Sequence, residues 1–511
     1  MFALARLIRA AFVMLRLDAL DFLNANAQIK PPRPLQVLAR LLAKRSTKTS
    51  TRAIRLSNAL ERLGPSYIKL GQFLATRADI IGETLAADLS MLQDKLPPFE
   101  REKALETIRQ EFGVPAETLF DEIGDAVAAA SIAQVHRCRL PAQDDGEGRE
   151  VAVKVLRPGI EKRFERDLSD FFWIARWIER LSKPARRLRP VQVVETLAAS
   201  VRQEMDLRME AAALSEAAEN IEPASGFRVP GPDWQRVSQR VLTTDWVEGI
   251  PLSDMNAIRA AGHDAKDLAT RIIRIFLKQA MEDGFFHADM HPGNLFVESD
   301  GTIVAVDFGI MSRLDVLERQ FLAGVLHGFL QRDYRRVAEL HFRLGYVPNH
   351  QNIDDFSLAL RSIGEPITDK DATDISMSRL LLQLFQVTAR FDMPTQPRLL
   401  LLQKTMVVVE GVARSLDPEH NMWESAKPVA RRWMERNLGF QARLSQLSDV
   451  LREAPAAMEN LAQILRRMEE RASPVSDERE SRFVYAIIRL GGLLSGGVLL
   501  GVAGWFLGRM S

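Results

Sequence analysis

Two short polar motifs near the middle of the chain constrain its fold more than any other feature. Residues 287–294 read H-A-D-M-H-P-G-N, and residues 307–309 read D-F-G. In the first motif Asp289 can lie beside an attacking group, while Asn294 can reach a metal ion from the same loop. Asp307 would supply a second oxygen ligand. Ligands of this kind suit Mg²⁺ at the phosphates of a nucleotide.

The segment between the two motifs predicts how they meet. Residues 295–297 and 302–306 are apolar and β-branched, and Asp300-Gly301 lies between them as a turn, so we expect a β-hairpin. The hairpin would return Asp307 to the loop that carries the first motif. A polar hairpin in an unrelated fold would explain a lone D-F-G, but it does not explain both motifs at this spacing.

The order of these motifs is typical of the protein-kinase fold, and a third element upstream agrees with it. Residues 151–155, V-A-V-K-V, alternate as a strand and place Lys154 where kinases hold nucleotide phosphates. Its expected partner is a glutamate on a helix, Glu210. We also expect a strand within residues 131–140, and a last strand of the small lobe within 240–249 that runs into the hinge.

Three departures from ordinary kinases are equally informative. No G-x-G-x-x-G precedes Lys154, and residues 128–131 read A-A-A-S instead, which predicts a stiffer loop over the nucleotide. The long stretch from Lys154 to Glu210 leaves room for inserted helices such as residues 164–181. No A-P-E follows the D-F-G, so the segment that usually docks a peptide substrate is missing or reduced.

Six short motifs in order resemble those of the atypical kinase-like AarF/UbiB family of ubiquinone biosynthesis. They are K-L-G-Q at 69–72, L-Q-D at 92–94 with Pro97-Pro98, A-A-A-S at 128–131, E-M-D at 204–206, Glu210-Ala211 after it, and the loop at 287–294. Each string alone is weak, whereas six in order are specific.

The resemblance implies a kinase-like fold that binds ATP and Mg²⁺, with the K-x-G-Q helices laid across the site where a protein substrate would enter. It implies catalytic roles for Asp289, Lys154 and Glu210. The implied metal ligands are Asn294 and Asp307. The implied nucleotide cleft consists of Ala128, Ala129, Ala130, Ser131, Lys154, Lys69, Gln72, Glu204 and Asp206. Within it, Lys69 and Gln72 would reach towards Glu204 and Asp206.

The family's role is the support of ubiquinone production, which implies action on lipid intermediates, isoprenoid quinone precursors or other proteins of the biosynthetic complex. Hydroxylation of the lipid ring is not supported, because the sequence has neither a dinucleotide-binding glycine motif nor a metal-ligand cluster suited to oxygen. A net charge of +1 gives no reason to expect nucleic acid. The single cysteine, Cys138, excludes an internal disulfide and suits a reducing compartment.

The two ends of the chain predict contact with a membrane. Residues 1–60 carry eleven Lys or Arg against two acids, and the helix expected over 2–23 either lies at a membrane interface or packs on the core. Residues 490–508 carry no charge and are long enough to span a bilayer, although a buried soluble helix or a re-entrant hairpin is the alternative. Two G-x-x-x-G patterns there would suit a homodimer. Arginines before the span predict a bacterial inner-membrane protein with a cytoplasmic kinase domain.

The expected fold class is α+β, a two-lobed protein-kinase-like fold with a helical extension and a C-terminal transmembrane helix. Its expected parts are a helical extension at 1–120, a small lobe with inserted helices at 121–250, a helical large lobe at 251–472 and a transmembrane segment at 483–508. Two interpretations remain open: an active ATPase or kinase, or a pseudokinase scaffold that binds nucleotide or lipid. Retention of all five kinase residues favours the first.

Overall fold

The computed structural model describes most of residues 2–438. Outside the description lie residues 1, 18, 20–50, 76, 78–80, 91, 93–95, 143–147, 182–185, 187–188, 223–224, 369–382, 384–386, 388–389, 394–396 and 439–511. The predicted C-terminal span at 490–508 is therefore outside the described residues. Within the described part, no helix is both long and apolar enough to cross a membrane. The described residues up to 434 form one compact unit.

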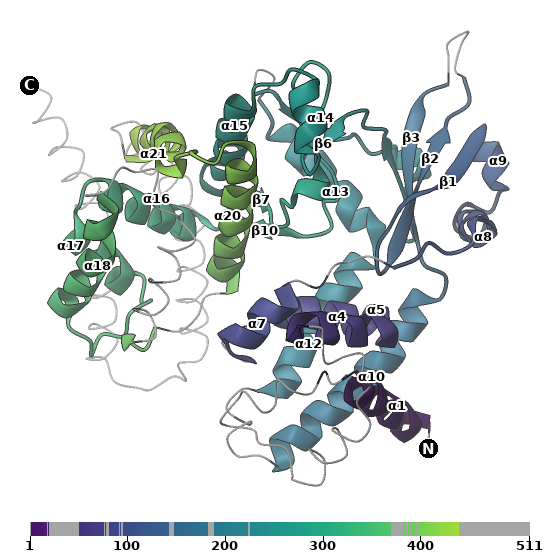
Figure 1. The fold of residues 1–511 in the computed structure, drawn as a ribbon, viewed down its shortest axis with the longest axis horizontal. Coiled ribbons are helices and arrows are strands. Elements are labelled where there is room, and N and C mark those ends of the chain that lie inside the picture. The colour runs from purple at the N-terminus through teal and green to yellow at the C-terminus, as the bar shows by residue number, and fades with distance from the viewer. Residues whose placement is uncertain are drawn as a thin grey trace, which may run out of the picture. The chain divides into compact units, whose positions relative to one another are not determined.

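A four-stranded antiparallel sheet carries the predicted lysine (Figure 1). Its spatial order is β1 (Glu122–Ala129), β2 (Ala133–Arg139), β3 (Glu150–Leu156) and β5 (Val241–Asp245). This confirms the strands expected within 131–140, 151–155 and 240–249. Side chains alternate along β3, so the three valines at 151, 153 and 155 are fully buried while Lys154 points to the other face.

The valine face of this sheet is covered by helix α8 (Arg101–Phe112), followed by the short α9 (Ala116–Leu119). Ala104 and Ile108 of α8 pack with the valines of β3. Cys138 of β2 belongs to the same cluster, and burial raises the pKa of its thiol to about 12. Cys138 is therefore a small core residue of this sheet.

The N-terminal extension is helical, as predicted, and forms a small core of its own. It consists of α1 (Phe2–Arg16), α4 (Arg52–Leu63), α5 (Pro65–Ala75) and α7 (Glu83–Ser90). Leu56 and Leu60 of α4 pack with Ile68 of α5 and Leu89 of α7. Ser66 of α5 donates to Asp167 at 2.7 Å. This buried bond joins the extension to the inserted helix α10 (Ile160–Leu181).

Three helices of the described part separate β3 from β5. They are α10 (Ile160–Leu181), α12 (Pro190–Glu204) and α13 (Leu207–Glu219), which confirms the helical insertion expected around 164–181. Asp206 caps α13, because its side chain accepts from the backbone N–H of Arg208. The short strand β4 (Phe227–Arg228) and the 3-10 turn η3 (Trp234–Arg236) lead on to β5.

The large lobe begins with β6 (Ile250–Pro251), α14 (Met255–Ala260) and α15 (Ala265–Lys278). A π-helical turn, η4 (Gln279–Asp283), extends α15. The catalytic-loop region contains β7 (Phe285–His287), the turn η5 (Pro292–Asn294), β8 (Leu295–Val297), β9 (Ile303–Ala305) and β10 (Met311–Arg313). Strands β8 and β9 pair antiparallel, which confirms the predicted hairpin.

Helices make up the rest of the described large lobe. They are α16 (Val316–Leu330), α17 (Tyr334–Arg343), α18 (Ile353–Thr368), α20 (Pro397–Leu416) and α21 (Met422–Leu438). Helix α20 lies against α15 (Figure 1). Phe276 of α15 and Phe286 of β7 are completely buried and stack edge to face at 6.1 Å. The core thus supports the catalytic loop directly.

Candidate active site

Lys154, Glu210 and Asp307 meet in one charged cluster. The Lys154 ammonium lies 2.9 Å from each carboxylate oxygen of Glu210 and 2.8 Å from one oxygen of Asp307. β3 supplies the lysine, the first turn of α13 supplies the glutamate, and the aspartate follows β9. The predicted pairing of Lys154 with Glu210 is present, and Asp307 shares the same lysine.

The exposure of these groups sets their electrostatics. The side chains of Lys154 and Glu210 are 17% and 7% exposed, whereas that of Asp307 is 48% exposed and reaches solvent. Burial alone would lower the pKa of Lys154, but the carboxylates of Asp307 and Glu210 outweigh it and raise that pKa. The same lysine holds the pKa of Asp307 well below its usual range. Burial raises the pKa of Glu210, and Asp307 adds to this although Lys154 opposes it.

Asp307 has an unusual backbone conformation. Its φ is +61°, in the left-handed region that aspartate tolerates better than most residues. The next residue, Phe308, is 1% exposed, and its ring meets that of His287 edge to face at 4.8 Å. At Gly309 a Cβ would lie 3.3 Å from Oδ1 of Asp307, so a larger residue would require that carboxylate to shift by a few tenths of an ångström. The three D-F-G residues therefore orient one exposed carboxylate.

The loop of Asp289 and Asn294 is connected to the same place by hydrogen bonds. The Asn294 carbonyl accepts from the N–H of Val306, one residue before Asp307. The Asn294 side-chain amide donates to the carbonyl of Asp289 at 3.1 Å and lies 3.5 Å from its carboxylate. Asn294 thus fixes the backbone around Asp289 while remaining half-buried.

His287 occupies the centre of this arrangement as a neutral ring. Its Nδ1 accepts from the N–H of Asp289 at 3.0 Å, so the proton is on Nε2, which lies 3.3 Å from the carbonyl of Val306. The ring is fully buried, and burial lowers its pKa, which agrees with the neutral form. His287 therefore ties the Asp289 loop to the D-F-G segment without carrying charge.

Two further residues hold this loop and were missed by sequence reasoning. The side-chain oxygen of Gln279, in the π-helical turn, accepts from the N–H of His287 at 3.2 Å. The hydroxyl of Thr405, on α20, is buried and lies 2.9 Å from the carbonyl of Ala288. Thr405 is distant in sequence from Ala288, and Gln279, although close to His287 along the chain, is aimed at it by the π-helical turn, so no motif could have predicted either contact.

The K-x-G-Q segment contributes a second buried ion pair. Lys69 of α5 lies 2.6 Å from Glu204 at the end of α12, with side-chain exposures of 10% and 14%. Its charge also helps to lower the pKa of Asp307, which places it near the cluster. Gln72, one turn later on α5, is half-buried. Of the two carboxylates predicted near Lys69, Glu204 is in contact with it, whereas Asp206 pairs with Arg208 at 2.7 Å.

The alanine-rich segment differs from the loop that we expected. Ala128 and Ala129 form the end of strand β1, where they pair with Val135 and Gln134. Of the four residues of this motif, Ala130 and Ser131 lie in the turn, because β1 continues to Ala129 and β2 begins at Ala133. Arg157 donates to the carbonyl of Ala130 at 2.8 Å, and Ser131 is buried.

The donor set fits a magnesium ion bound with phosphate. Asp307 and Asn294 offer oxygen ligands beside a lysine, and Mg²⁺ usually takes one or two carboxylates and completes its shell with water and phosphate oxygens. No group of three or more His, Cys, Asp or Glu side chains that could hold a metal occurs among the residues that the structure describes. A dedicated all-protein metal cage is thus not what these residues form.

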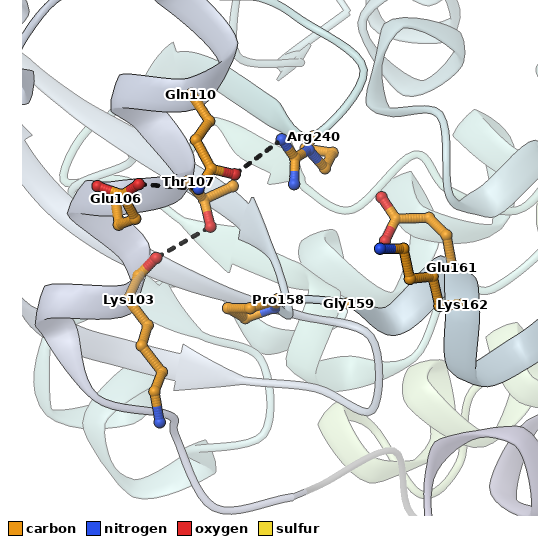
Figure 2. A pocket seen from close by; sticks show the side chains of 9 residues that line it. All are labelled: Lys103, Glu106, Thr107, Gln110, Pro158, Gly159, Glu161, Lys162 and Arg240. Carbon is orange, nitrogen blue, oxygen red and sulfur yellow. Dashed lines mark hydrogen bonds between the residues drawn. The ribbon is translucent and has the colours of Figure 1, made fainter.

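A separate cavity lies on the small lobe, shown in Figure 2. It has a volume of about 570 Å³ and is lined by Lys103, Glu106, Thr107, Gln110, Pro158, Gly159, Glu161, Lys162 and Arg240. Charges of both signs line it, and none of the predicted site residues does. We therefore assign the candidate site to the cluster around Lys154, which brings a lysine and two carboxylates together.

Comparison with known proteins agrees with this geometry. The ABC1 atypical kinase-like domain matches residues 91–341, and the UbiB helical domain matches residues 360–421. The chain is 39% identical over 511 residues to the probable protein kinase UbiB of Azotobacter vinelandii, with 98% of this chain and 93% of that protein covered. It is 40% identical over 405 residues to the probable protein kinase UbiB of Pasteurella multocida, with 77% of each covered.

Among solved structures, that of Rv3197 from Mycobacterium tuberculosis with erythromycin covers 75% of this chain and 98% of its own, at 23% identity and a TM-score of 0.45. The two family domains together include β3, the catalytic loop, the D-F-G segment and Thr405 of α20. From its sequence matches over nearly the whole length, the chain belongs to the UbiB family of atypical kinases.

Proposed function

We propose that this protein is a membrane-anchored atypical kinase or ATPase that binds ATP and Mg²⁺ and supports ubiquinone biosynthesis. The observation that carries the proposal is the contact of Lys154 with both Glu210 and Asp307. A hydrogen bond from Val306 to Asn294 places this cluster next to the loop of Asp289. These five side chains are the ones that phosphoryl transfer requires of a kinase-like protein.

Each residue has a distinct role in this proposal. Bound Mg²⁺ would neutralise charge on the phosphates, held by Asp307 and Asn294. Lys154 keeps its positive charge through its two carboxylates and can turn it towards phosphate oxygens. Asp289 would accept the proton of the attacking hydroxyl or water. Because Lys154 contacts both carboxylates, Glu210 could remain the lysine's partner while Asp307 holds a metal ion.

The segment after D-F-G supports an acceptor other than a peptide. It forms the short strand β10, which pairs with β7, and α16 then begins at Val316. Only six residues separate Gly309 from α16, so there is no extended platform for a protein substrate. We propose that the acceptor is water, a lipid intermediate of the quinone or a component of the biosynthetic complex.

Anchoring to the bacterial inner membrane is proposed from residues 490–508, with the kinase domain on the cytoplasmic side. Deletion of residues 483–511 should convert integral behaviour into soluble or peripheral behaviour. Extraction of membranes with carbonate tests this. Persistence of the truncated protein in the extracted membrane would place the anchor elsewhere.

The decisive experiment measures ATP hydrolysis and nucleotide binding by the full-length protein in detergent, with and without added lipid. Magnesium-dependent turnover that is lost in Asp289→Asn supports the proposal. Nucleotide binding without turnover under any lipid condition would favour a pseudokinase scaffold. A peptide-kinase assay on the same preparation should remain negative, and robust peptide phosphorylation would overturn the proposed acceptor class.

A further inference from the structure

Helix α10 leaves an aromatic and basic face open to solvent. Trp173 and Trp177 are each 44% exposed, and their ring centroids lie 5.6 Å apart. Arg176 and Arg180 are exposed on the same side of the helix, because residues three and four apart are neighbours on its surface. The opposite side of α10 buries Phe164, Leu168, Phe171 and Ala175 in the main core.

The two arginines on this face are not neutralised. Neither Arg176 nor Arg180 has a carboxylate partner in the described part of the chain, and Arg176 lies only over the ring of Phe172, at 6.0 Å. Glu179, the acid between them, accepts from the N–H of Val191 at 3.1 Å and is half-buried. The exposed Glu165 lies about two turns before Trp173 on α10. The tryptophans therefore lie in a locally positive surface.

Helix α1 is fixed to α10 and has the same character. Arg6 makes two bonds of 2.7 Å to Asp170, which is 3% exposed in the pair. Ile8 and Phe12 of α1 are 60% and 43% exposed. The helix contains no acidic residue, and its exposed Arg9 and Arg16 have no carboxylate partner among the described residues. Two joined helices thus each expose apolar side chains beside arginines that have no carboxylate partner in the described part of the chain.

We infer that α1 and α10 form a contact surface for the headgroup region of an anionic membrane. Tryptophan is enriched at the boundary between headgroups and acyl chains, where its ring is apolar and its N–H remains hydrated. Arginines without carboxylate partners are complementary to anionic lipid headgroups. A protein partner would need a matching acidic and apolar surface, whereas a bilayer interface satisfies both features at once. This surface contains none of the residues of the candidate nucleotide site.

Two matched serines allow a test on the full-length protein. Ser169 lies one turn before Trp173, is exposed, and bonds through its hydroxyl to the carbonyl three residues earlier. Ser362 of α18 is exposed and makes the same kind of bond. Ser169→Cys and Ser362→Cys would each carry an environment-sensitive fluorophore. The native Cys138 is buried with a raised thiol pKa and should stay unlabelled.

Both labelled proteins would be reconstituted in phosphatidylglycerol vesicles that contain a lipid with a shallow spin-label quencher. We expect a blue shift and quenching at position 169 and neither at 362. The signal at 169 should be lost with Trp173→Ala and Trp177→Ala together, and weakened by Arg176→Gln with Arg180→Gln. Arg335→Gln with Arg361→Gln is the control for a loss of two exposed arginines; both pair with carboxylates on another face of the molecule, and their replacement should change nothing.

Three outcomes would overturn the inference. Equal quenching at positions 169 and 362 would mean that α10 has no special relation to the bilayer. A label at 169 that is shielded before vesicles are added would mean that another segment of this chain covers the face. Shielding that grows with protein concentration in detergent would mean that a second copy covers it. ATP hydrolysis measured on the same samples reports separately on the proposed function.

Discussion

Two buried lysine–glutamate pairs lie in different parts of the molecule, and their surroundings differ. Lys154 and Glu210 share their contact with Asp307, whose side chain is 48% exposed. Lys69 and Glu204 connect the extension helix α5 to α12, with both side chains nearly buried. In the first pair the lysine has a carboxylate that a ligand can displace, whereas the second pair joins two helices.

The two lysines illustrate two different roles of a buried charge. A lysine with two carboxylates keeps its charge after one of them turns to a metal ion, so its positive charge is available throughout a reaction cycle. Lys69 and Glu204 instead hold α5 against α12, and loss of the lysine leaves the nearly buried carboxylate of Glu204 without this partner. Changes in the first pair should therefore act on catalysis, whereas changes in the second should act mainly on stability and secondarily on nucleotide affinity.

The largest effect is expected for Asp307→Asn. The change keeps the shape of the side chain but removes a charged metal ligand, so we expect a loss of ATP turnover on the order of 10³-fold, about 4 kcal/mol, with the fold intact. Asp300→Asn in the same hairpin is the matched control, because Asp300 is exposed and bonds only within its turn. Full activity of a well-folded Asp307→Asn protein would remove Asp307 from the metal site.

Lys69→Ala addresses the second pair. Leaving Glu204 without its partner at 14% exposure should lower the free energy of unfolding by about 3 kcal/mol and change nucleotide affinity. The double variant Lys69→Ala with Glu204→Ala should recover part of that stability in thermal denaturation. Neither should gain peptide phosphorylation. Unchanged melting and nucleotide affinity in Lys69→Ala would exclude this lysine from the site.

The pH dependence of stability tests a buried group of the helical lobe that belongs to neither lysine–glutamate pair. His341 of α17 is buried between the rings of Phe321 and Phe356, and burial lowers its pKa to about 4. The unfolded chain takes up this proton near pH ~6.5, so stability should fall by about 2 kcal/mol as the pH decreases from there towards 4. His341→Gln should flatten that slope in chemical denaturation, whereas the exposed His350→Gln should not. An unaltered slope would assign the pH dependence to other groups.

The smallest effect is expected for Thr405→Val. The hydroxyl contact with the Ala288 carbonyl is lost, and a buried neutral hydrogen bond contributes about 1 kcal/mol, so kcat should fall by roughly fivefold to tenfold. Nucleotide affinity should remain, since Thr405 does not touch the Lys154 cluster. Thr405→Ser should restore turnover if the bond positions the loop. Equal loss in the serine variant would point to packing instead.

Sequence reasoning predicted the parts of the site that depend on local pattern. Alternation identified β3 and its Lys154, and the turn at Asp300-Gly301 identified the β8–β9 hairpin. The position of Glu210 on a helix opposite Lys154 also followed from motif order. These features need only short-range information, because the periodicity of a strand or a turn is visible in a few residues.

Other features depend on competition between partners and could not be read from a motif. Asp206 caps its own helix and binds Arg208, because a local N-cap geometry outcompetes a distant lysine. Ala128 and Ala129 continue a strand that glycines would have interrupted. Gln279 and Thr405 reach the loop only after α15 and α20 have packed.

The π-helical turn after α15 has a consequence for the tolerance of this protein to change. A π-turn contains one residue more than an α-turn, and this extra residue sets the direction in which Gln279 points before the chain enters β7. Deleting one residue from the buried Ala280-Met281 pair would restore regular helix and rotate the preceding side chains by about 100° relative to β7. Single-residue deletions in this turn should therefore reduce activity and stability more than conservative replacements on the exposed surface of the same helix. A replacement changes one side chain and leaves the phase of the helix intact.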